Sequence, residues 1–503
     1  MGAGRGAASM RLCALPLLWM SRMRAGAAGL AGEMGRSAAP VAHDPSAADC
    51  CGPQFTASRG SLLLNGKKIH LKGLSWFGFE GNQAVVDGLW QRSVDSYLDF
   101  MVSNHFNAIR VPLALNNILF NPIPSSTMLS AEPSFVGGDS LGLLENVVMR
   151  AASKGILVLL DMHRLNSSVW PDPRGLWYND RVTFEMLKSS WTELARRFCK
   201  HWNVFGADLL NEPHGGTWGS GHEATDWDRA AELLGNNVLR HCARWVVFVE
   251  GIGQAGRVTP EYFWGENLEG LRHRKLSLHL PDKLVYSPHV YVSRPLGPGL
   301  WRFMHYFNEP RLAETMPRVW HTHFGFLLED PTFTLVLGEF GGPANKPADI
   351  EWQRTLVDYL TRHGHVSSFY WCLNPNAGDT GGLLKDDWKT PNQVKLDVLR
   401  PLHSSSIVDL LRGSPPFSAK AFGRGLALHE AAGAISQCRT SNSLGGSLVA
   451  KLQFCNGVAE CTDHSDEESC SFAPCVTVAG PDTYSACRLP FFYNGSHTAP
   501  SGS

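Results

Sequence analysis

The fold is decided by the stretch Leu-Leu-Glu-Asn-Val-Val-Met-Arg-Ala-Ala-Ser-Lys-Gly-Ile-Leu-Val-Leu-Leu-Asp-Met-His, residues 143–163. Its first part, 143–154, is helix-like. Its second part, 155–163, is apolar on consecutive positions, as expected for a parallel strand that is covered on both faces. A helix that runs directly into a buried strand predicts one unit of an α/β fold.

Similar units occur on both sides of this stretch. Helix-like segments such as 93–103 and 183–200 lie between most of the apolar runs, which recur about every 42 residues. Eight such units within about 350 residues predict a (β/α)8 TIM barrel. A doubly wound open sheet is the alternative, but no Gly-rich dinucleotide fingerprint follows the first run. The other seven runs are 70–77, 107–113, 204–212, 245–251, 284–291, 333–340 and 367–374. The barrel is assigned to residues 55–405.

The N-terminal segment is typical of a targeting signal. Residues 1–32 are Arg-rich and contain no acid, the run 12–20 is apolar, and small residues follow at 25–29. This order describes a secretory signal peptide, with an organellar transit peptide as the alternative. The apolar run is too short to span a bilayer. Residues 33–54 are expected to be a linker. We therefore expect secretion, or else an organellar or lysosome-like compartment.

The C-terminal segment has a different composition. A linker rich in Ser, Pro, Gly and Ala is predicted at 406–437, a Cys-rich module at 438–487 and a tail at 488–503. Six of the 12 cysteines fall in the module, which predicts disulfides and an oxidising compartment. The sequons at Asn166 and Asn494 are compatible with glycosylation there. The barrel cysteines Cys199, Cys242 and Cys372 are widely spaced and are interpreted as buried apolar thiols.

Composition excludes several classes of protein. With 45 Lys and Arg against 46 Asp and Glu, the net charge is −1, which argues against a nucleic-acid binder. Hydrophobic residues make up 44%, too many for a disordered chain. No segment of the mature chain has 18 consecutive apolar residues, so we expect no transmembrane span. We also expect the protein to be a monomer.

Polar and aromatic residues gather at the carboxyl ends of six predicted strands. In a barrel these ends converge on one mouth, where active sites lie. Each residue has a structural alternative, such as a satisfied core histidine, but six coincidences on six strands favour a site. The residues are Arg110, His163, Asn211, Glu212, His289, Tyr291, Glu339 and Trp371.

Two of these residues, Glu212 and Glu339, follow apolar runs directly and are expected to be partly desolvated. Two carboxyls in different surroundings can divide into a protonated and an ionised group, as glycosidic-bond cleavage requires. A gap of about 5 Å between them would indicate a retaining route. Arg110 would keep one of them ionised. Further Trp residues that could line a cleft are Trp90, Trp177, Trp218, Trp264 and Trp388.

The remaining site residues fit the same interpretation. The Asn211 amide can donate to a sugar hydroxyl, and the Tyr291 hydroxyl can donate to an ionised nucleophile. The Trp371 indole offers a flat apolar face to a pyranose.

The ordered set of motifs resembles glycoside hydrolase family five, the cellulase-type family of clan A. The matching segments are Ile109-Arg-Val-Pro112, Leu160-Asp-Met-His163, Leu210-Asn-Glu-Pro213, Tyr286-Ser-Pro-His-Val-Tyr291, Leu337-Gly-Glu-Phe-Gly341 and Phe369-Tyr-Trp371. The resemblance implies that Glu212 is the general acid/base and Glu339 the nucleophile, with Arg110, His163, Asn211, His289, Tyr291 and Trp371 in supporting positions. It implies that no cofactor is needed for catalysis.

Three further stretches look most like secreted endo-β-1,4-glucanases of bacterial type. They are Gly73-Leu-Ser-Trp-Phe-Gly78, Gly88-Leu-Trp90 and Asp379-Thr-Gly-Gly-Leu-Leu-Lys-Asp-Asp-Trp388. They imply cleavage of internal bonds in cellulose or a related β-linked polysaccharide. A β-mannanase, a β-1,3-glucanase and an endoglycoceramidase can share the barrel and both acids, because fold does not fix substrate. A non-catalytic carbohydrate-binding or adhesion protein is the alternative of another class. The presence of both Glu212 and Glu339 counts against it.

Residues 454–470 resemble the second half of a low-density-lipoprotein-receptor class A repeat. The resemblance implies a structural Ca²⁺ held by Asn456, Glu460, Asp466 and Glu467, since Ca²⁺ prefers oxygen ligands. Asn456 replaces the usual Asp, and no cysteine lies between Cys438 and Cys455. A disulfide-stapled module without metal is therefore the alternative.

Overall fold

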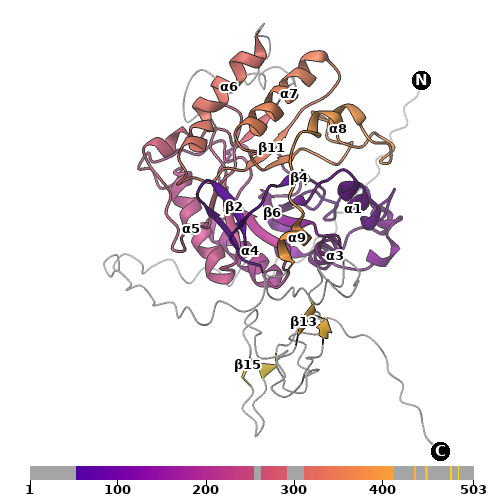
Figure 1. Cartoon of the computed structure of the whole chain (residues 1–503). Coiled ribbons are helices and arrows are strands. Elements are labelled where there is room, and N and C mark those ends of the chain that lie inside the picture. The colour runs from indigo at the N-terminus through magenta and orange to yellow at the C-terminus, as the bar shows by residue number, and fades with distance from the viewer. Residues whose placement is uncertain are drawn as a thin grey trace, which may run out of the picture. The chain divides into compact units, whose positions relative to one another are not determined.

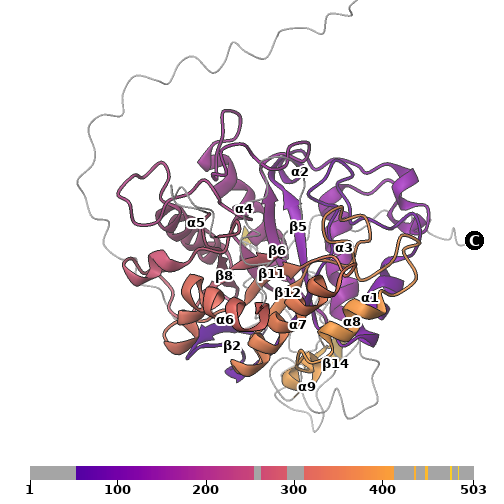
Figure 2. The same ribbon diagram turned by 90° about the horizontal axis from the view of Figure 1, so that it is seen from above.

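The computed structural model describes residues 53–253, 262–291 and 311–412, and beyond them only the backbone of four short strands. Parallel strands lie at the centre of the main body and helices surround them (Figures 1 and 2). Each of the eight predicted strands is found at its predicted place. The strands are β4 (Lys72–Ser75), β5 (Ala108–Ala114), β6 (Leu157–Arg164), β7 (Val204–Asp208), β8 (Val246–Val249), β9 (Leu284–Tyr286), β10 (His289–Tyr291), β11 (Leu337–Gly341) and β12 (Ser368–Tyr370).

The sheet closes on itself. Its order is β10-β11-β12-β4-β5-β6-β7-β8-β9, and all of the pairs are parallel. The two ends of this order, β9 and β10, are consecutive in the chain and are separated only by Ser287 and Pro288. They are one interrupted strand, which pairs with β8 through its first half and with β11 through its second. This closure confirms the predicted (β/α)8 barrel.

The helices begin where their capping residues allow. Ser93 caps α1 (Val94–Ser103), Asp139 caps α3 (Ser140–Ser153) and Thr183 caps α4 (Phe184–Phe198), each through a side-chain oxygen that accepts a backbone N–H of the first turn. The predicted helix-like segments 93–103, 143–154 and 183–200 therefore start close to true caps. The other α-helices are α2 (Leu115–Phe120), α5 (Trp227–His241), α6 (Leu312–His323), α7 (Pro347–Arg362), α8 (Gln393–Leu399) and α9 (Ile407–Leu411).

A three-stranded antiparallel sheet covers the amino-terminal end of the barrel. It consists of β1 (Phe55–Ser58), β2 (Ser61–Leu64) and β3 (Lys67–Lys68). Phe55 and Leu64 bury their side chains completely against barrel residues such as Phe205 and Phe248. Because this end is filled with apolar side chains, only the carboxyl ends of the strands are left for chemistry.

The prediction that Cys199 and Cys242 are free apolar thiols is wrong. Their sulfur atoms form a disulfide, with 5.6 Å between the Cα atoms. Cys199 ends α4 and Cys242 ends α5, and these helices pack side by side on the outside of the barrel. The spacing of 43 residues gave no sign of this pairing, because only the barrel brings the two helix ends together. Cys372 is free and buried, as predicted.

We expect the Cys199→Ala, Cys242→Ala double variant to lose roughly 2–4 kcal/mol of unfolding free energy, because the cross-link constrains the unfolded chain. Urea unfolding followed by tryptophan fluorescence measures this loss. Full reduction of the wild type should reproduce it. An unchanged midpoint in both experiments would show that the cross-link does not stabilise the barrel.

The predicted signal peptide at 1–32 lies outside the described residues. So do the side chains of the Cys-rich module, including Asn456, Glu460, Asp466 and Glu467. The described backbone beyond the barrel forms two short antiparallel pairs, Ile435–Gln437 with Leu448–Ala450 and Val476–Thr477 with Ser485–Ala486. Within the described part of the chain, every helix is too short or too polar to cross a bilayer.

Candidate active site

Glu212 and Glu339 meet at the carboxyl end of the barrel. Glu339 lies within β11, directly opposite His289 of β10 in the parallel register. Glu212 lies just beyond β7 and has a φ of +47°, a left-handed conformation that few non-glycine residues adopt. A carboxylate oxygen of Glu212 and one of Glu339 lie within 4.8 Å of each other. The structure thus brings together the two acids that the sequence singled out.

Glu339 is surrounded by groups that favour its ionised form. One carboxylate oxygen accepts a hydrogen bond from the Arg110 guanidinium and the other accepts one from the Tyr291 hydroxyl. Burial is the largest influence and raises the pKa of Glu339, and Arg110, His163 and the Tyr291 hydrogen bond limit this rise. These partners make Glu339 the acid of the pair that ionises first.

Among the residues that the structure describes, no Lys or Arg side chain pairs directly with Glu212. Its Oε1 lies 3.1 Å from Nδ1 of His289, and burial keeps the pKa of this histidine well below its usual value, so the imidazole is neutral. Burial, reinforced by the charge of Glu339, raises the pKa of Glu212 well above its ordinary value. The surroundings therefore favour the proton on Glu212 and the negative charge on Glu339, which is the division that acid-assisted bond cleavage requires.

Arg110 is the centre of a buried charge network that sequence reasoning missed. The fully buried guanidinium lies 2.9 Å from Asp208, 3.1 Å from Asp161 and 3.3 Å from Glu250, in addition to its bond with Glu339. Burial raises the pKa of Asp161 and of Asp208 to about 7. One permanent cation cannot balance four buried anions, so part of this network carries protons.

A signal for these acids was present in the sequence. Asp161 and Asp208 interrupt otherwise apolar strands, and Glu250 ends one. An acid inside a buried strand requires a buried partner. Arg110, on the predicted strand 107–113, was the available cation.

The other predicted site residues lie around these groups. The Asn211 side-chain oxygen accepts a hydrogen bond of 2.9 Å from Arg110. The backbone N–H of Asn211 donates to the Met162 carbonyl. Nδ1 of His163 lies 2.7 Å from Asp161, and the His163 ring stacks on Trp371 with 5.3 Å between centroids. All eight residues predicted for the mouth therefore belong to one connected site.

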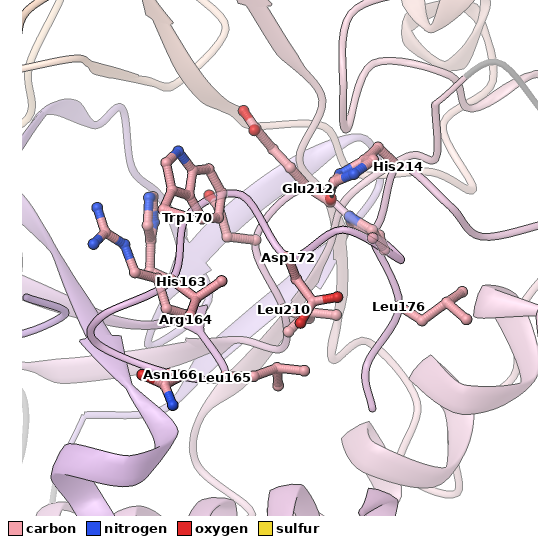
Figure 3. Close-up of a pocket in the computed structure, with 14 residues that line it drawn as sticks. His163, Arg164, Leu165, Asn166, Trp170, Asp172, Leu176, Leu210, Glu212 and His214 are labelled. Atoms are coloured by element: carbon pink, nitrogen blue, oxygen red, sulfur yellow. Dashed lines mark hydrogen bonds between the residues drawn. The ribbon is translucent and has the colours of Figure 1, made fainter. Parts of the chain in front are cut away.

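A small, open pocket lies on the Glu212 side of the mouth. Trp170, which the sequence analysis did not select, lines it, stacks on His163 with 5.0 Å between centroids and is 40% exposed. Figure 3 shows Trp170 and His214 on either side of Glu212. His214 stacks on the predicted residue Trp264 at 4.0 Å. Two flat aromatic surfaces thus border the protonated carboxyl.

None of the tryptophans predicted from the sequence lines this pocket. Trp388 is 6% exposed and packs against Trp90 and Tyr97, so it supports Trp90 from the core and does not offer a face of its own. Trp177 is buried against Trp227. Trp218 donates its ring N–H to the Arg274 carbonyl. Trp177 and Trp388 are therefore core residues and do not line a cleft.

Among the described residues, three groups of His, Asp and Glu are close enough to hold a metal ion. They are Asp161 with His163 and Glu339, Asp208 with Glu250 and His289, and Glu212 with His289 and Glu339. Each group includes a carboxylate that is paired with Arg110. The fixed charge of the guanidinium opposes a second cation at the same place, so these residues fit an ion-pair network better than a metal site.

A closed (β/α)8 barrel with a protonated and an ionised carboxyl at its mouth defines a glycoside hydrolase. The sequence model of the cellulase family, glycosyl hydrolase family 5, matches residues 63–377, and the chain belongs to this family.

Similar proteins include an endoglucanase of Paenibacillus polymyxa, 36% identical over 369 residues that cover 72% of this chain and 89% of the relative. The major extracellular endoglucanase of Xanthomonas campestris is 36% identical and covers 73% of this chain and 75% of its own length. Among solved structures, an endocellulase of Pyrococcus horikoshii is similar with a TM-score of 0.63 and 36% identity, over 70% of this chain and 98% of that one.

Proposed function

We propose that this chain is an endo-β-1,4-glucanase that cleaves internal bonds of cellulose or a related β-glucan by double displacement. The observation that carries the proposal is the close pair of Glu212 and Glu339, each in surroundings suited to a different protonation state. The relatives favour a β-1,4-glucan over a mannan, a β-1,3-glucan or a glycosphingolipid. They are named endoglucanases, and the Pyrococcus horikoshii endocellulase is described in complex with cellotetraose.

In the first step, the Glu339 carboxylate attacks the anomeric carbon while Glu212 donates its proton to the leaving glycosidic oxygen. Arg110 and Tyr291 hold the Glu339 carboxylate in place for this attack. In the second step, the ionised Glu212 takes a proton from water, which attacks the glycosyl-enzyme and releases Glu339. The chemistry uses only side chains of the chain itself, and we propose that it needs no cofactor.

The pocket beside Glu212 fits the departing part of the glycan. The leaving oxygen must lie next to the group that protonates it, so the sugar that carries this oxygen lies on the Glu212 side. Trp170 and His214 offer flat faces there, and Trp264 supports the His214 ring by stacking on it. Trp371, stacked on His163, is proposed to support the sugar that Glu339 attacks.

We also propose that the enzyme is secreted. The Arg-rich N-terminal segment, the barrel disulfide and the extracellular endoglucanase among the relatives support this proposal. A calcium ion in the C-terminal module and a monomeric state stay proposals from the sequence alone.

The substrate is tested by comparing release of reducing ends from carboxymethylcellulose, β-1,4-mannan, β-1,3-glucan and a glycosphingolipid. We expect the soluble β-1,4-glucan to be the best substrate, with a rapid loss of viscosity because internal bonds are cut. A higher rate on one of the other three would reassign the substrate. No release from any of them would favour the carbohydrate-binding alternative.

We expect the first-formed reducing end to have the β configuration. Inverting enzymes hold their two carboxyl groups about 6.5–9.5 Å apart, so that a water molecule fits between the sugar and the base. Here carboxylate oxygens of Glu212 and Glu339 approach to within 4.8 Å, which leaves no room for this water. Proton NMR of cellotetraose hydrolysis, recorded before mutarotation, distinguishes the anomers. An initial α anomer would mean inversion and a wider site in solution.

A further inference from the structure

We propose that Glu250 is a positioning residue that aims the acid/base Glu212, an inference that rests on the proposed glycosidase function. Glu250 follows β8 directly, and its side chain is fully buried. It lies on a different strand from both catalytic acids. One carboxylate oxygen of Glu250 binds the backbone of Glu212 directly, and the other lies next to His289, which contacts the Glu212 carboxyl.

The first route is a direct bond to the backbone. Oε2 of Glu250 accepts the N–H of Glu212 at 2.8 Å. Glu212 has a left-handed backbone at φ +47°, a conformation that is strained for an L-residue. A fixed acceptor for its amide stabilises this turn, and the turn determines where the Glu212 carboxyl points.

The second route reaches the carboxyl through an imidazole. Oε1 of Glu250 lies 3.1 Å from Nε2 of His289, and Nδ1 of the same ring lies 3.1 Å from Oε1 of Glu212. Nδ1 also lies 3.6 Å from Glu339. The contact between Glu250 and His289 is close but lacks hydrogen-bond geometry, so it acts on the ring through packing and charge. The direct hydrogen bond of Glu250 to the Glu212 N–H therefore carries the proposal, and the imidazole contact adds to it.

The surroundings hold Glu250 itself in one position. Nη2 of Arg110 lies 3.3 Å from its Oε1, and Trp227 donates its ring N–H to the Glu250 carbonyl. Gly265, at φ +78°, packs against Glu250, Glu212 and His289. A Cβ there would lie 2.7 Å from Oε2 of Glu250 and 3.5 Å from side-chain carbons of Glu212 and His289. The three residues therefore pack together beneath one glycine.

Glu250→Gln tests the proposal with little change in volume. The amide nitrogen must face either the Glu212 N–H or the Arg110 guanidinium, so one hydrogen bond becomes a contact between two donors. Gly265→Ala disturbs the same group without changing a titratable residue. We expect both full-length variants to misalign the acid. Arg110 and Tyr291 still bind the two carboxylate oxygens of Glu339 in each variant, so we expect the nucleophile to stay in place.

The readout is the dependence on the leaving group. We expect kcat/KM for cellotetraose to fall about 10- to 100-fold in each variant, because alignment of the acid contributes part of the about 10²–10⁴-fold of acid–base catalysis. With 2,4-dinitrophenyl β-cellobioside, whose leaving group needs no proton, kcat/KM should stay within about threefold of the wild type, since proton donation then contributes nothing. A merely structural residue would lower both values together.

Glu132→Gln is the matched control. Glu132 is also buried, accepts the N–H of Val94 at 3.0 Å and pairs with Arg150 at 2.9 Å. Neither of these partners belongs to the group around Glu212 and Glu339. We expect it to leave the ratio between the two substrates unchanged.

Two outcomes would overturn the proposal: equal loss on both substrates in the Glu250 and Gly265 variants, or no loss on either. The wild type serves as the separate test of the proposed function, which fails if the unmodified chain does not cleave cellotetraose. Thermal unfolding of each variant confirms that the compared chains are folded.

Discussion

Replacement of Glu339 by Gln is expected to abolish hydrolysis, with kcat on a soluble β-1,4-glucan reduced by at least about 10⁴-fold, as for removal of a nucleophile in other enzymes. The amide occupies the space of the carboxylate but cannot form the glycosyl-enzyme bond. The loss should be the same for cellotetraose and for an activated aryl β-cellobioside, because attack by Glu339 is needed in both reactions.

The fold should survive this substitution. Glu339 lies within β11, whose backbone pairs with β10 and β12, and the Gln side chain can still accept from Tyr291 or Arg110. Circular dichroism and thermal unfolding check this, and Glu132→Gln serves as the matched control with wild-type activity. Activity of a folded Glu339→Gln variant at even a tenth of the wild-type rate would refute the assignment of the nucleophile.

Replacement of Glu212 by Gln is expected to lower kcat/KM for cellotetraose by about 10³-fold, within the range of acid–base catalysis. Unlike Glu339→Gln, this variant should form the glycosyl-enzyme from 2,4-dinitrophenyl β-cellobioside at a rate close to that of the wild type. The second step should then be slow, because no base activates water. A burst of dinitrophenol, equal to the enzyme concentration and followed by slow turnover, is the measurable result.

The burst distinguishes the two acids. It should be present in Glu212→Gln and absent in Glu339→Gln. A burst in Glu339→Gln, or an equal loss on both substrates in Glu212→Gln, would mean that the two roles are exchanged or that one acid is not catalytic.

The pH dependence of the wild type follows from the same assignment. Glu339 must be ionised, so activity rises with pH as its carboxyl loses its proton. Glu212 must be protonated, so activity falls at higher pH as its raised pKa is passed. The pH profile of kcat/KM is therefore expected to be bell-shaped. For 2,4-dinitrophenyl β-cellobioside, whose leaving group needs no proton, the fall at alkaline pH should disappear.

The sequence alone predicted the barrel, which the structure confirms, and it singled out Glu212 and Glu339, which the structure brings together. Consecutive apolar residues such as 157–160 and 204–207 leave no polar face, so these strands must be covered on both sides, and their regular spacing determined the order of the units. Glu212 and Glu339 were visible because each follows or ends such a run, and strand ends of a barrel converge by geometry. These are local properties of the chain, and local patterns can be read without coordinates.

Only the tertiary structure decided which distant groups touch. The disulfide of Cys199 with Cys242 depends on two helices packing side by side. The four carboxylates around Arg110 come from four different strands, and Trp170 borders the site because its loop folds over the mouth. Such contacts depend on closure of the barrel through the interrupted strand β9 and β10, a property of the whole sheet. The division of protons between Glu212 and Glu339 depends on the same closure, since burial and Arg110 act on them only once the strands have met.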